Sequence, residues 1–391
     1  MGRKLKLPFD FIFRQLRPLF FTGDAETAHE RMLSSIESIS RIPGLLAFLR
    51  WQFREESTVL RSRLFGSTLQ NPVGLAAGFD KDGRIHPVLF ALGFGFVEIG
   101  TVTPLPQSGN PHPRLFRLLE DHALINRMGF NNQGAWKMAE RLVSRTKIIK
   151  PEEASFFEDS SDYPANISSG ILGINIGKNK DTPLDKAAED YVSALSTLHP
   201  FADYFTINIS SPNTEDLRNL QEKDALHGLL DSVCARRDKL DQNHLRNTPL
   251  LVKLAPDLHQ EELENSLQAI QQFSIQGVIA TNTTVERPEL KSQYRHENGG
   301  LSGKPLRKRS TEVIRNLFQE LGKEVPIIGV GGIFRGKDAY EKIRAGASAV
   351  QIYTALIYEG PGLVNKIKRE LEKLLKKDGF NSVTDAVGVD S

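Results

Sequence analysis

Eight short apolar runs, spaced along most of the chain, constrain the possible folds more than any other feature of the sequence. Each run is nearly all apolar, as a strand that is buried on both faces must be, and helical patterns separate most of the runs. This alternation predicts a closed (β/α)₈ barrel, or TIM barrel, with an open doubly wound sheet as the alternative. The runs cover residues 72–76, 96–99, 173–176, 204–209, 250–254, 277–280, 327–330 and 349–352, and the helical patterns include residues 184–198, 225–240, 261–273, 310–321 and 336–345.

The composition narrows the class of protein. Of the 391 residues, 39% are apolar and 25% are charged, as in a globular protein with a sizeable core. The formal net charge of +2 provides no general field that would attract nucleic acid. The single cysteine, Cys234, excludes an intramolecular disulfide, and the nine histidines lack the spacing of a metal site. We therefore expect neither a metal nor a nucleic-acid partner.

Residues 1–55 differ in character from the rest of the chain and predict a small helical cap, followed by the barrel over residues 56–391. A basic stretch, residues 3–21, carries apolar side chains at helical spacing, and Pro18 should end or kink that helix. No stretch reaches the roughly 20 apolar residues of a spanning helix, and the apolar core of a secretory signal is missing.

A second helix should begin with Asp24 as its N-cap and stop at Pro43-Gly44, and a third apolar piece covers residues 45–53. Two interpretations of these helices remain open on the residues alone. They could form a cap packed on the barrel, or an amphipathic patch whose arginines and phenylalanines lie on an anionic membrane surface.

Two segments interrupt the regular alternation. Residues 101–125 contain four prolines and end in a strand-like run at 114–118, an excursion too long for a simple loop between strand and helix. Residues 150–169 are rich in Glu, Asp and Ser and predict a solvated surface insertion, to which we assign no chemistry.

Polar and small residues follow every apolar run, where a barrel carries its active site. One such polar strand end would be explained by the residues that turns prefer. Eight of them would place amides, hydroxyls and two lysines around one opening. Glycines after the seventh run and a hydroxyl after the eighth occupy positions where barrels commonly hold a phosphate. The absence of a GxGxxG turn after the first run disfavours a dinucleotide of Rossmann type.

Eight motifs together carry a resemblance to a known family. They are NPVGLAAGFDK at 71–81, NRMGFN at 126–131, INIGKNK at 174–180, NISSPNT at 208–214, KLAPD at 253–257, TNTT at 281–284, GGLSG at 299–303 and PIIGVGG at 326–332. In this order and with these gaps, they closely resemble class 2 dihydroorotate dehydrogenase, the quinone-dependent and membrane-associated form. The resemblance extends from about residue 25 to about residue 379.

The resemblance implies an FMN enzyme of pyrimidine biosynthesis that oxidises (S)-dihydroorotate to orotate and passes the electrons to a quinone. Ser211 matches the catalytic base, with a proton relay through Thr214 and ordered water past Phe130. A serine hydroxyl is a weak base, so burial and the fit of the substrate must assist it. Class 1 enzymes carry cysteine at this position, so Ser211 favours class 2.

Substrate and cofactor positions follow from the same resemblance. Lys253 is expected near the edge of the flavin, where its charge would stabilise the reduced form, although an ion pair with Asp257 is the alternative. Substrate-binding positions are Lys81, Asn126, Arg127, Met128, Gly129, Phe130, Asn208, Asn213, Asn282 and Thr283. FMN-binding positions are Ala77, Gly78, Phe79, Asp80, Lys81, Thr101, Asn175, Asn208, Lys253, Thr281, Gly303, Gly332, Tyr353 and Thr354.

At the N-terminus, the resemblance favours the membrane-surface interpretation. Family members use two helices as an apolar funnel for the quinone, and His29, Arg117 and Tyr353 match its inner end. We expect a peripheral protein on the cytoplasmic face of a bacterial inner membrane, with the mitochondrial inner membrane as the alternative. We also expect a monomer.

Three rival functions remain. A Schiff-base aldolase on the same barrel would use Lys253 as its nucleophile and would need no flavin. A class 1-type enzyme would pass electrons to a soluble acceptor, and a membrane-docked binder would hold a ligand without reacting.

Overall fold

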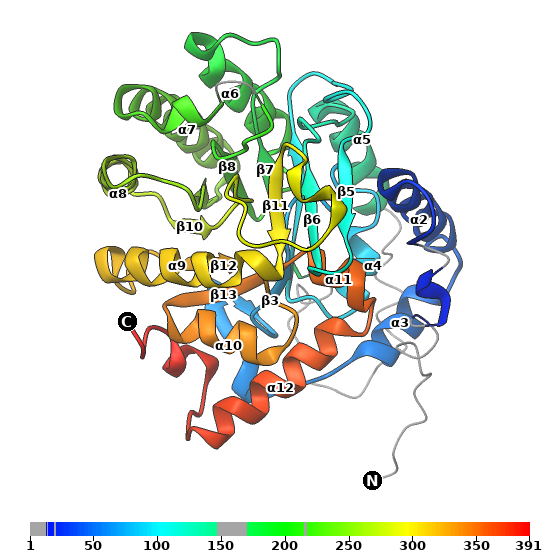
Figure 1. Cartoon of the computed structure of the whole chain (residues 1–391). Coiled ribbons are helices and arrows are strands. Elements are labelled where there is room, and N and C mark those ends of the chain that lie inside the picture. Colours follow the sequence, from blue (N-terminus) through cyan, green and yellow to red (C-terminus); the bar gives the residue numbers. More distant parts are fainter. Residues whose placement is uncertain (1–12, 14, 19–20, 147–169, 215–216) are drawn as a thin grey trace.

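The computed structural model describes residues 13, 15–18, 21–146, 170–214 and 217–391, and a closed parallel barrel forms its centre (Figure 1). All eight predicted strands are present, so the open-sheet alternative is wrong. Around the barrel their order is β10, β12, β13, β3, β4, β7, β8 and β9. Their bounds are β3 Val73–Leu75, β4 Phe96–Val102, β7 Ile171–Ile176, β8 Tyr204–Asn208, β9 Leu250–Leu254, β10 Gly277–Ala280, β12 Ile327–Val330 and β13 Ala347–Ile352.

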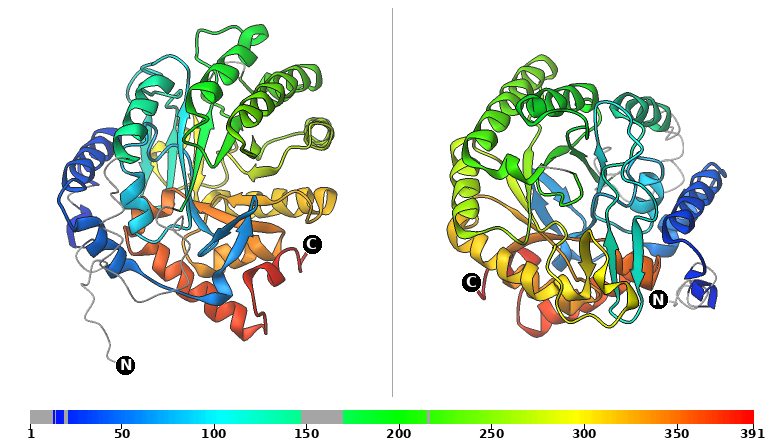
Figure 2. Two further views of the ribbon diagram at one scale, coloured as in Figure 1. Left: turned by 180° about the vertical axis from the view of Figure 1, so that it is seen from behind. Right: turned by 45° about the horizontal axis from the view of Figure 1, so that its top comes forward.

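Helices surround the barrel as an outer ring (Figure 2). The five predicted helical patterns are confirmed, and each helix turns an apolar stripe inward, as in α9, where Val313, Ile314 and Leu317 are buried. The helices of the ring and its connections are α4 His86–Ala91, α5 Ala135–Thr146, α6 Ala187–Leu198, α7 Lys223–His244, α8 Gln260–Gln272, α9 Arg307–Leu321, α10 Gly336–Arg344, α11 Thr354–Glu359 and α12 Leu363–Lys377. Short 3-10 helices are η1 Thr58–Leu60, η3 Leu184–Lys186, η4 Leu217–Gln221, η5 Gln293–His296, η6 Lys304–Leu306 and η7 Val383–Ala386.

A hairpin of two short strands, β1 Ser62–Leu64 and β2 Ser67–Leu69, packs against the amino end of the barrel. Its tip residue Phe65 contacts Tyr204, with ring centroids 5.5 Å apart. Leu64 and Leu69 join the cluster of apolar side chains inside the barrel. The hairpin therefore covers the end of the barrel opposite to the carboxyl ends of the strands.

A three-stranded antiparallel sheet stands beside the carboxyl ends of the barrel strands (Figure 1). It consists of β5 Leu115–Leu118, β6 Ala123–Asn126 and β11 Gly300–Gly303, in the order β11, β6, β5. The strand-like run predicted at 114–118 is thus β5. The long excursion after β4 contributes the outer part of this sheet.

The described part of the N-terminal region holds two helices, α2 Ala25–Ile39 and α3 Leu45–Phe53, at one side of the barrel (Figure 2). Asp24 is the N-cap of α2, as predicted, and its carboxylate accepts from the Thr27 amide at 2.7 Å. The predicted end at Pro43-Gly44 is wrong, because α2 ends at Ile39, and Gly44 instead precedes α3 in a left-handed conformation.

Other predictions, for the cap and for the insertion, remain untested. Most of the helix predicted over residues 3–21 lies outside the described residues, although residues 13 and 15–18 are helical. The insertion at 150–169 also lies outside them. Across the described helices, none combines the length and apolarity needed to cross a bilayer. The division between residues 55 and 56 stays a prediction.

Candidate active site

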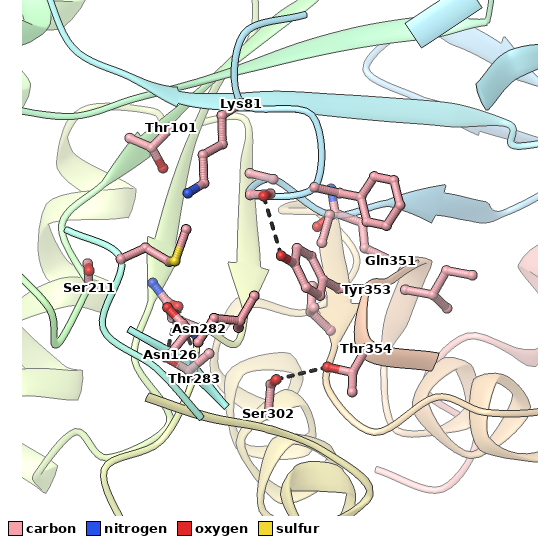
Figure 3. Close-up of a pocket in the computed structure, with 18 of the residues that line it drawn as sticks. Lys81, Thr101, Asn126, Ser211, Asn282, Thr283, Ser302, Gln351, Tyr353 and Thr354 are labelled. Carbon is pink, nitrogen blue, oxygen red and sulfur yellow. Dashed lines mark hydrogen bonds between the residues drawn. The ribbon is translucent and has the colours of Figure 1, made fainter. Parts of the chain in front are cut away.

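A cavity opens at the carboxyl ends of the barrel strands and gathers most of the predicted site residues (Figure 3). Its walls also include side chains of α2 and of the three-stranded sheet. The predicted residues that line it are His29, Ala77, Gly78, Phe79, Lys81, Thr101, Asn126, Met128, Gly129, Phe130, Asn208, Ser211, Asn213, Lys253, Thr281, Asn282, Thr283, Gly303, Gly332, Tyr353 and Thr354.

Five predicted site residues lie outside the cavity lining. Asp80 is buried and accepts hydrogen bonds from the amides of the two residues Arg84 and Ile85, so it stabilises the loop after β3. Asn175 is fully buried beneath the lining. Thr214 is buried, and its hydroxyl has no hydrogen-bond partner among the described residues.

The other two are arginines with partners elsewhere. Arg127 forms an ion pair with Glu297 at 2.7 Å and lies over the ring of Phe116. Arg117 donates to the carbonyl of Gly23 at 2.5 Å and lies 5.1 Å from the centroid of the Phe21 ring. Arg117 therefore connects the sheet to the cap.

Ser211 follows the end of β8 and faces the cavity, with 5% of its surface exposed. Its hydroxyl oxygen accepts from the amide of Asn213 at 3.3 Å, which leaves the hydroxyl proton available for another partner. The Asn213 side chain donates to Asn126 at 3.2 Å, while its buried oxygen has no partner in the described structure. An unpaired buried acceptor of this kind is a site for a ligand donor.

Two lysines bring positive charge into the cavity. Lys81 donates to the side-chain oxygen of Asn131, and burial lowers the pKa of Lys81 to about 8, while Glu26 opposes that change. Burial also lowers the pKa of Lys253, and Glu98 partly offsets this. Lys253 makes no hydrogen bond within the described part of the chain.

Asp257 has partners of its own, so the alternative ion pair with Lys253 is not present. Arg218 pairs with Asp257 at 3.3 Å, and the hydroxyl of Thr284 donates to it at 2.5 Å. Lys253 is thus left as a buried cation with no carboxylate in hydrogen-bond contact among the described residues, and it lines the cavity.

The turn after β12 brings backbone close to the cavity. Gly331 and Gly332 both have positive φ, at 120° and 73°. A Cβ at Gly332 would lie 2.7 Å from the Cα of Arg307, so only glycine fits there. Nearby, the hydroxyls of Ser302 and Thr354 are 2.8 Å apart (Figure 3). Backbone amides that line a cavity beside hydroxyls suit a phosphate or another anion.

On the side facing the cap, aromatic rings form the cavity wall. The ring of His29 contacts Phe79 edge-on at 4.9 Å, and Phe79 contacts Tyr353 edge-on at 5.8 Å. Nε2 of His29 lies 2.8 Å from the carbonyl oxygen of Phe79. Burial lowers the pKa of His29 and raises the pKa of Tyr353 to about 12, so both side chains are neutral near pH 7.

Several residues of the site were missed by sequence reasoning. Asn131 orients Lys81, and Ser302 bonds Thr354, yet both lie in motifs that could have suggested them. Glu98, which is a charged residue inside an apolar strand, is the clearest missed signal. Within the described residues, no group of three or more potential metal ligands occurs.

The chain is similar to known proteins along most of its length. The family described as dihydroorotate dehydrogenase matches residues 59–375. A protein of Christiangramia forsetii named dihydroorotate dehydrogenase (quinone) is 46% identical over 362 residues, covering 93% of this chain and 98% of that protein. The mitochondrial dihydroorotate dehydrogenase (quinone) of Mus musculus is 48% identical over 368 residues, covering 94% of this chain and 87% of that protein.

A solved structure is similar as well. The crystal structure of the Eimeria tenella enzyme DHODH in complex with ferulenol is 38% identical and superposes with a TM-score of 0.83. The similarity covers 97% of this chain and 98% of that chain. The likeness therefore includes the cap region as well as the barrel.

Proposed function

We propose roles for the residues of the cavity from one premise, that the chain belongs to the dihydroorotate dehydrogenase family. Its relatives in bacteria and in mouse are named as quinone-dependent enzymes. The chain accordingly oxidises dihydroorotate in pyrimidine biosynthesis and uses a quinone as the electron acceptor. The class 1 and aldolase alternatives are not favoured.

FMN is the cofactor that the cavity fits. Lys253 offers a buried cation with no hydrogen-bonded carboxylate among the described residues, and Gly331 and Gly332 offer backbone close to the opening. Two hydroxyls, on Ser302 and Thr354, stand at the same end. We assign the phosphate to this end and the flavin edge to Lys253, with Thr101, Asn208 and Thr281 completing the pocket. When bound, FMN supplies the acceptor for a hydride and the donor for the quinone.

Dihydroorotate is assigned to the part of the cavity between Ser211 and Lys81. The substrate carries one carboxylate, and Lys81 is the cation that can pair with it. Asn126, Asn213 and Asn282 supply both donors and acceptors, which suits a ring whose edge alternates N–H and C=O. The buried, unpaired oxygen of Asn213 supports this placement, because a ring N–H would satisfy it.

Ser211 is assigned the proton from the substrate carbon. Its hydroxyl lies buried at the end of β8 and, among the described residues, accepts one hydrogen bond, from the amide of Asn213 at 3.3 Å. The unpartnered hydroxyl of Thr214, three residues on, is the next group along the proposed proton path. Phe130, held with φ of 54°, forms the wall beside this path.

The quinone is assigned to the aromatic wall that faces the cap. His29, Phe79 and Tyr353 are neutral there, as an apolar electron acceptor requires. Exposed apolar side chains on the described cap helices, Ile39 and Phe48, support contact with a lipid surface. We propose a peripheral monomer on the cytoplasmic face of a bacterial inner membrane, or on the mitochondrial inner membrane.

The observation that carries these assignments is the gathering of Ser211, the three asparagines and Lys81 in one buried cavity. Anaerobic mixing of the purified protein with dihydroorotate should bleach the bound flavin, and a short-chain quinone should restore its absorbance. A protein without flavin, or one that does not bleach, would refute the proposal. Bleaching without recovery by quinone would refute the assignment of the acceptor.

A further inference from the structure

Glu98, in the middle of β4, is a fully buried carboxylate that no step described above uses. Four uncharged side chains donate hydrogen bonds to it. Three of them converge on one oxygen, Oε2: Tyr204 at 3.0 Å, Thr206 at 3.2 Å and Gln351 at 2.9 Å. Within the described structure, the other oxygen, Oε1, accepts from Asn175 alone, at 2.8 Å.

The bond to Asn175 determines which way that amide points. Because a carboxylate only accepts hydrogen bonds, Asn175 must turn its NH₂ group toward Glu98 and its oxygen away. That oxygen accepts from the NH₂ group of Asn208 at 3.0 Å and from the hydroxyl of Thr101. The orientation of Asn175 therefore determines the orientation of Asn208.

Asn208 continues this series of oriented amides into the cavity. Since its NH₂ group is used on Asn175 and Thr101, its oxygen must face Ser210 and Asn282. The hydroxyl of Ser210 donates to this oxygen at 3.2 Å, and the NH₂ group of Asn282 lies 3.4 Å from it. Thr101, Asn208 and Asn282 all line the cavity. One buried carboxylate is thus the first member of a series of hydrogen-bonded amides that ends at the cavity.

We propose that Glu98 is a positioning residue that sets, through Asn175 and Asn208, which atoms of the cavity floor are donors and which are acceptors. A planar ring with alternating N–H and C=O groups can be read only by a floor whose polarity is fixed. The identity of that ring rests on the proposed function. The hydrogen-bond chain itself rests only on the contacts between the residues.

The charge of Glu98 is the property that matters, because an amide of the same shape would not give the same order. After E98Q, either orientation of the new amide costs a contact. With its NH₂ group toward Tyr204, Thr206 and Gln351, the two hydroxyls must accept instead of donate and Gln351 must turn over. In the other orientation, the new NH₂ group faces the NH₂ group of Asn175. Asn175 could avoid this clash only by turning over, which would present its NH₂ group to that of Asn208. The reversed orientation would thus pass from Asn175 to Asn208, and from Asn208 to the cavity.

Exchanging the acid and the amide between positions 98 and 175 tests this series of hydrogen bonds. In the double variant E98Q/N175D, the amide at position 98 donates to a carboxylate at position 175, and that carboxylate accepts from Thr101 and Asn208 as before. N175D alone places two buried carboxylates face to face, which is strongly unfavourable. The four proteins to compare are the wild type, E98Q, N175D and the double variant.

Two measurements follow, namely orotate affinity, from the absorbance change of the bound flavin, and the midpoint of thermal unfolding. E98Q should weaken orotate binding roughly 10- to 100-fold, because a buried polar partner is lost, and should lower the midpoint by a few degrees. N175D should bind orotate more weakly than E98Q and should have a lower midpoint of thermal unfolding. The double variant should recover to within about threefold of the wild-type affinity and should have a higher midpoint than either single variant.

Thr206→Val is the matched control, because it removes a donor to Oε2 of Glu98 without altering the hydrogen bonds from Glu98 through Asn175 to Asn208. It should lower the midpoint but leave orotate affinity unchanged. Wild-type affinity in E98Q, or a double variant no better than N175D, would overturn the proposal. If the wild type failed to bind orotate, the proposed function would fail, and the unfolding midpoints would still decide whether the amide chain exists.

Discussion

The mouth of the barrel and the N-terminal cap are held by different kinds of contact. At the mouth, Asn175, Asn208 and Thr101 are joined by buried hydrogen bonds between uncharged groups. On the cap, charged groups join α2 to the barrel in addition to its apolar contacts, with Arg84 bonding Glu37 at 2.8 Å and Glu30 at 2.9 Å. Buried neutral contacts keep one geometry, whereas partly exposed ion pairs depend on their surroundings.

This difference matches the two tasks. A proton and a hydride leave the substrate correctly only when the reacting groups are fixed to a fraction of an ångström. A quinone needs an apolar opening, which the proposal assigns to the wall that faces the cap. Perturbing the mouth should therefore affect chemistry, and perturbing the cap should affect access of the acceptor.

Deleting residues 1–53 provides the largest test of this separation. Quinone-dependent turnover should fall to background, because the wall that includes His29 is lost, while the rate of flavin bleaching by dihydroorotate should persist. Stopped-flow absorbance measures the two half-reactions separately. Loss of bound flavin in the truncated protein would contradict the separation of mouth and cap.

Ser211→Ala tests the mouth alone. Flavin bleaching should slow by roughly 10²- to 10⁴-fold, the range typical of a lost general base, with reoxidation by quinone unchanged. The rates of bleaching and recovery in one anaerobic experiment provide the measurement. An equal loss in both half-reactions would remove Ser211 from the role of base.

The pKa of Lys81 predicts a pH dependence of binding. Burial lowers this pKa to about 8, so the ammonium is present below pH 8 and is lost above it. Orotate binding should therefore weaken as pH rises through 8, approaching tenfold per unit at higher pH. Titrations between about pH 6 and pH 9 would measure this, and Lys81→Gln should remove the dependence. The same slope in that variant would show that another group titrates.

The smallest effect is expected at Arg84, which ties α2 to the barrel. Arg84→Met should raise the KM for quinone roughly two- to fivefold with little change in flavin bleaching, because its ion pairs are only partly shielded from solvent. Arg41→Met is the control, since Arg41 approaches the same Glu37 at 3.8 Å but its side chain is 72% exposed. Equal effects from both variants would indicate a general loss of positive charge.

Sequence reasoning succeeded where the pattern was local. The eight strands were predictable because each is a nearly all-apolar run, and the residues after each run had to meet at one end of the barrel. Ser211, Lys81 and Lys253 were located in this way, because the position of a strand end fixes the position of its neighbours in sequence.

Contacts between distant segments were not predictable from local patterns. Glu98 and Gln351 are 253 residues apart, and only barrel closure brings them together. The ion pair between Glu26 and Arg114 joins α2 to the long excursion for the same reason. The end of α2 at Ile39 was missed because Pro43 permits an earlier end without requiring one.

The link between Glu26 and Arg114 limits how freely this enzyme could exchange its parts. Arg114 also donates to the carbonyl of Asn110 at 2.7 Å, and the Asn110 side chain donates to the carbonyl of Asn213 at 2.9 Å. A cap transplanted from a relative would leave Arg114 buried and unpaired unless it brought a glutamate to the same place. The cap and the barrel thus share one buried ion pair, and a functional chimera must keep that glutamate with its arginine.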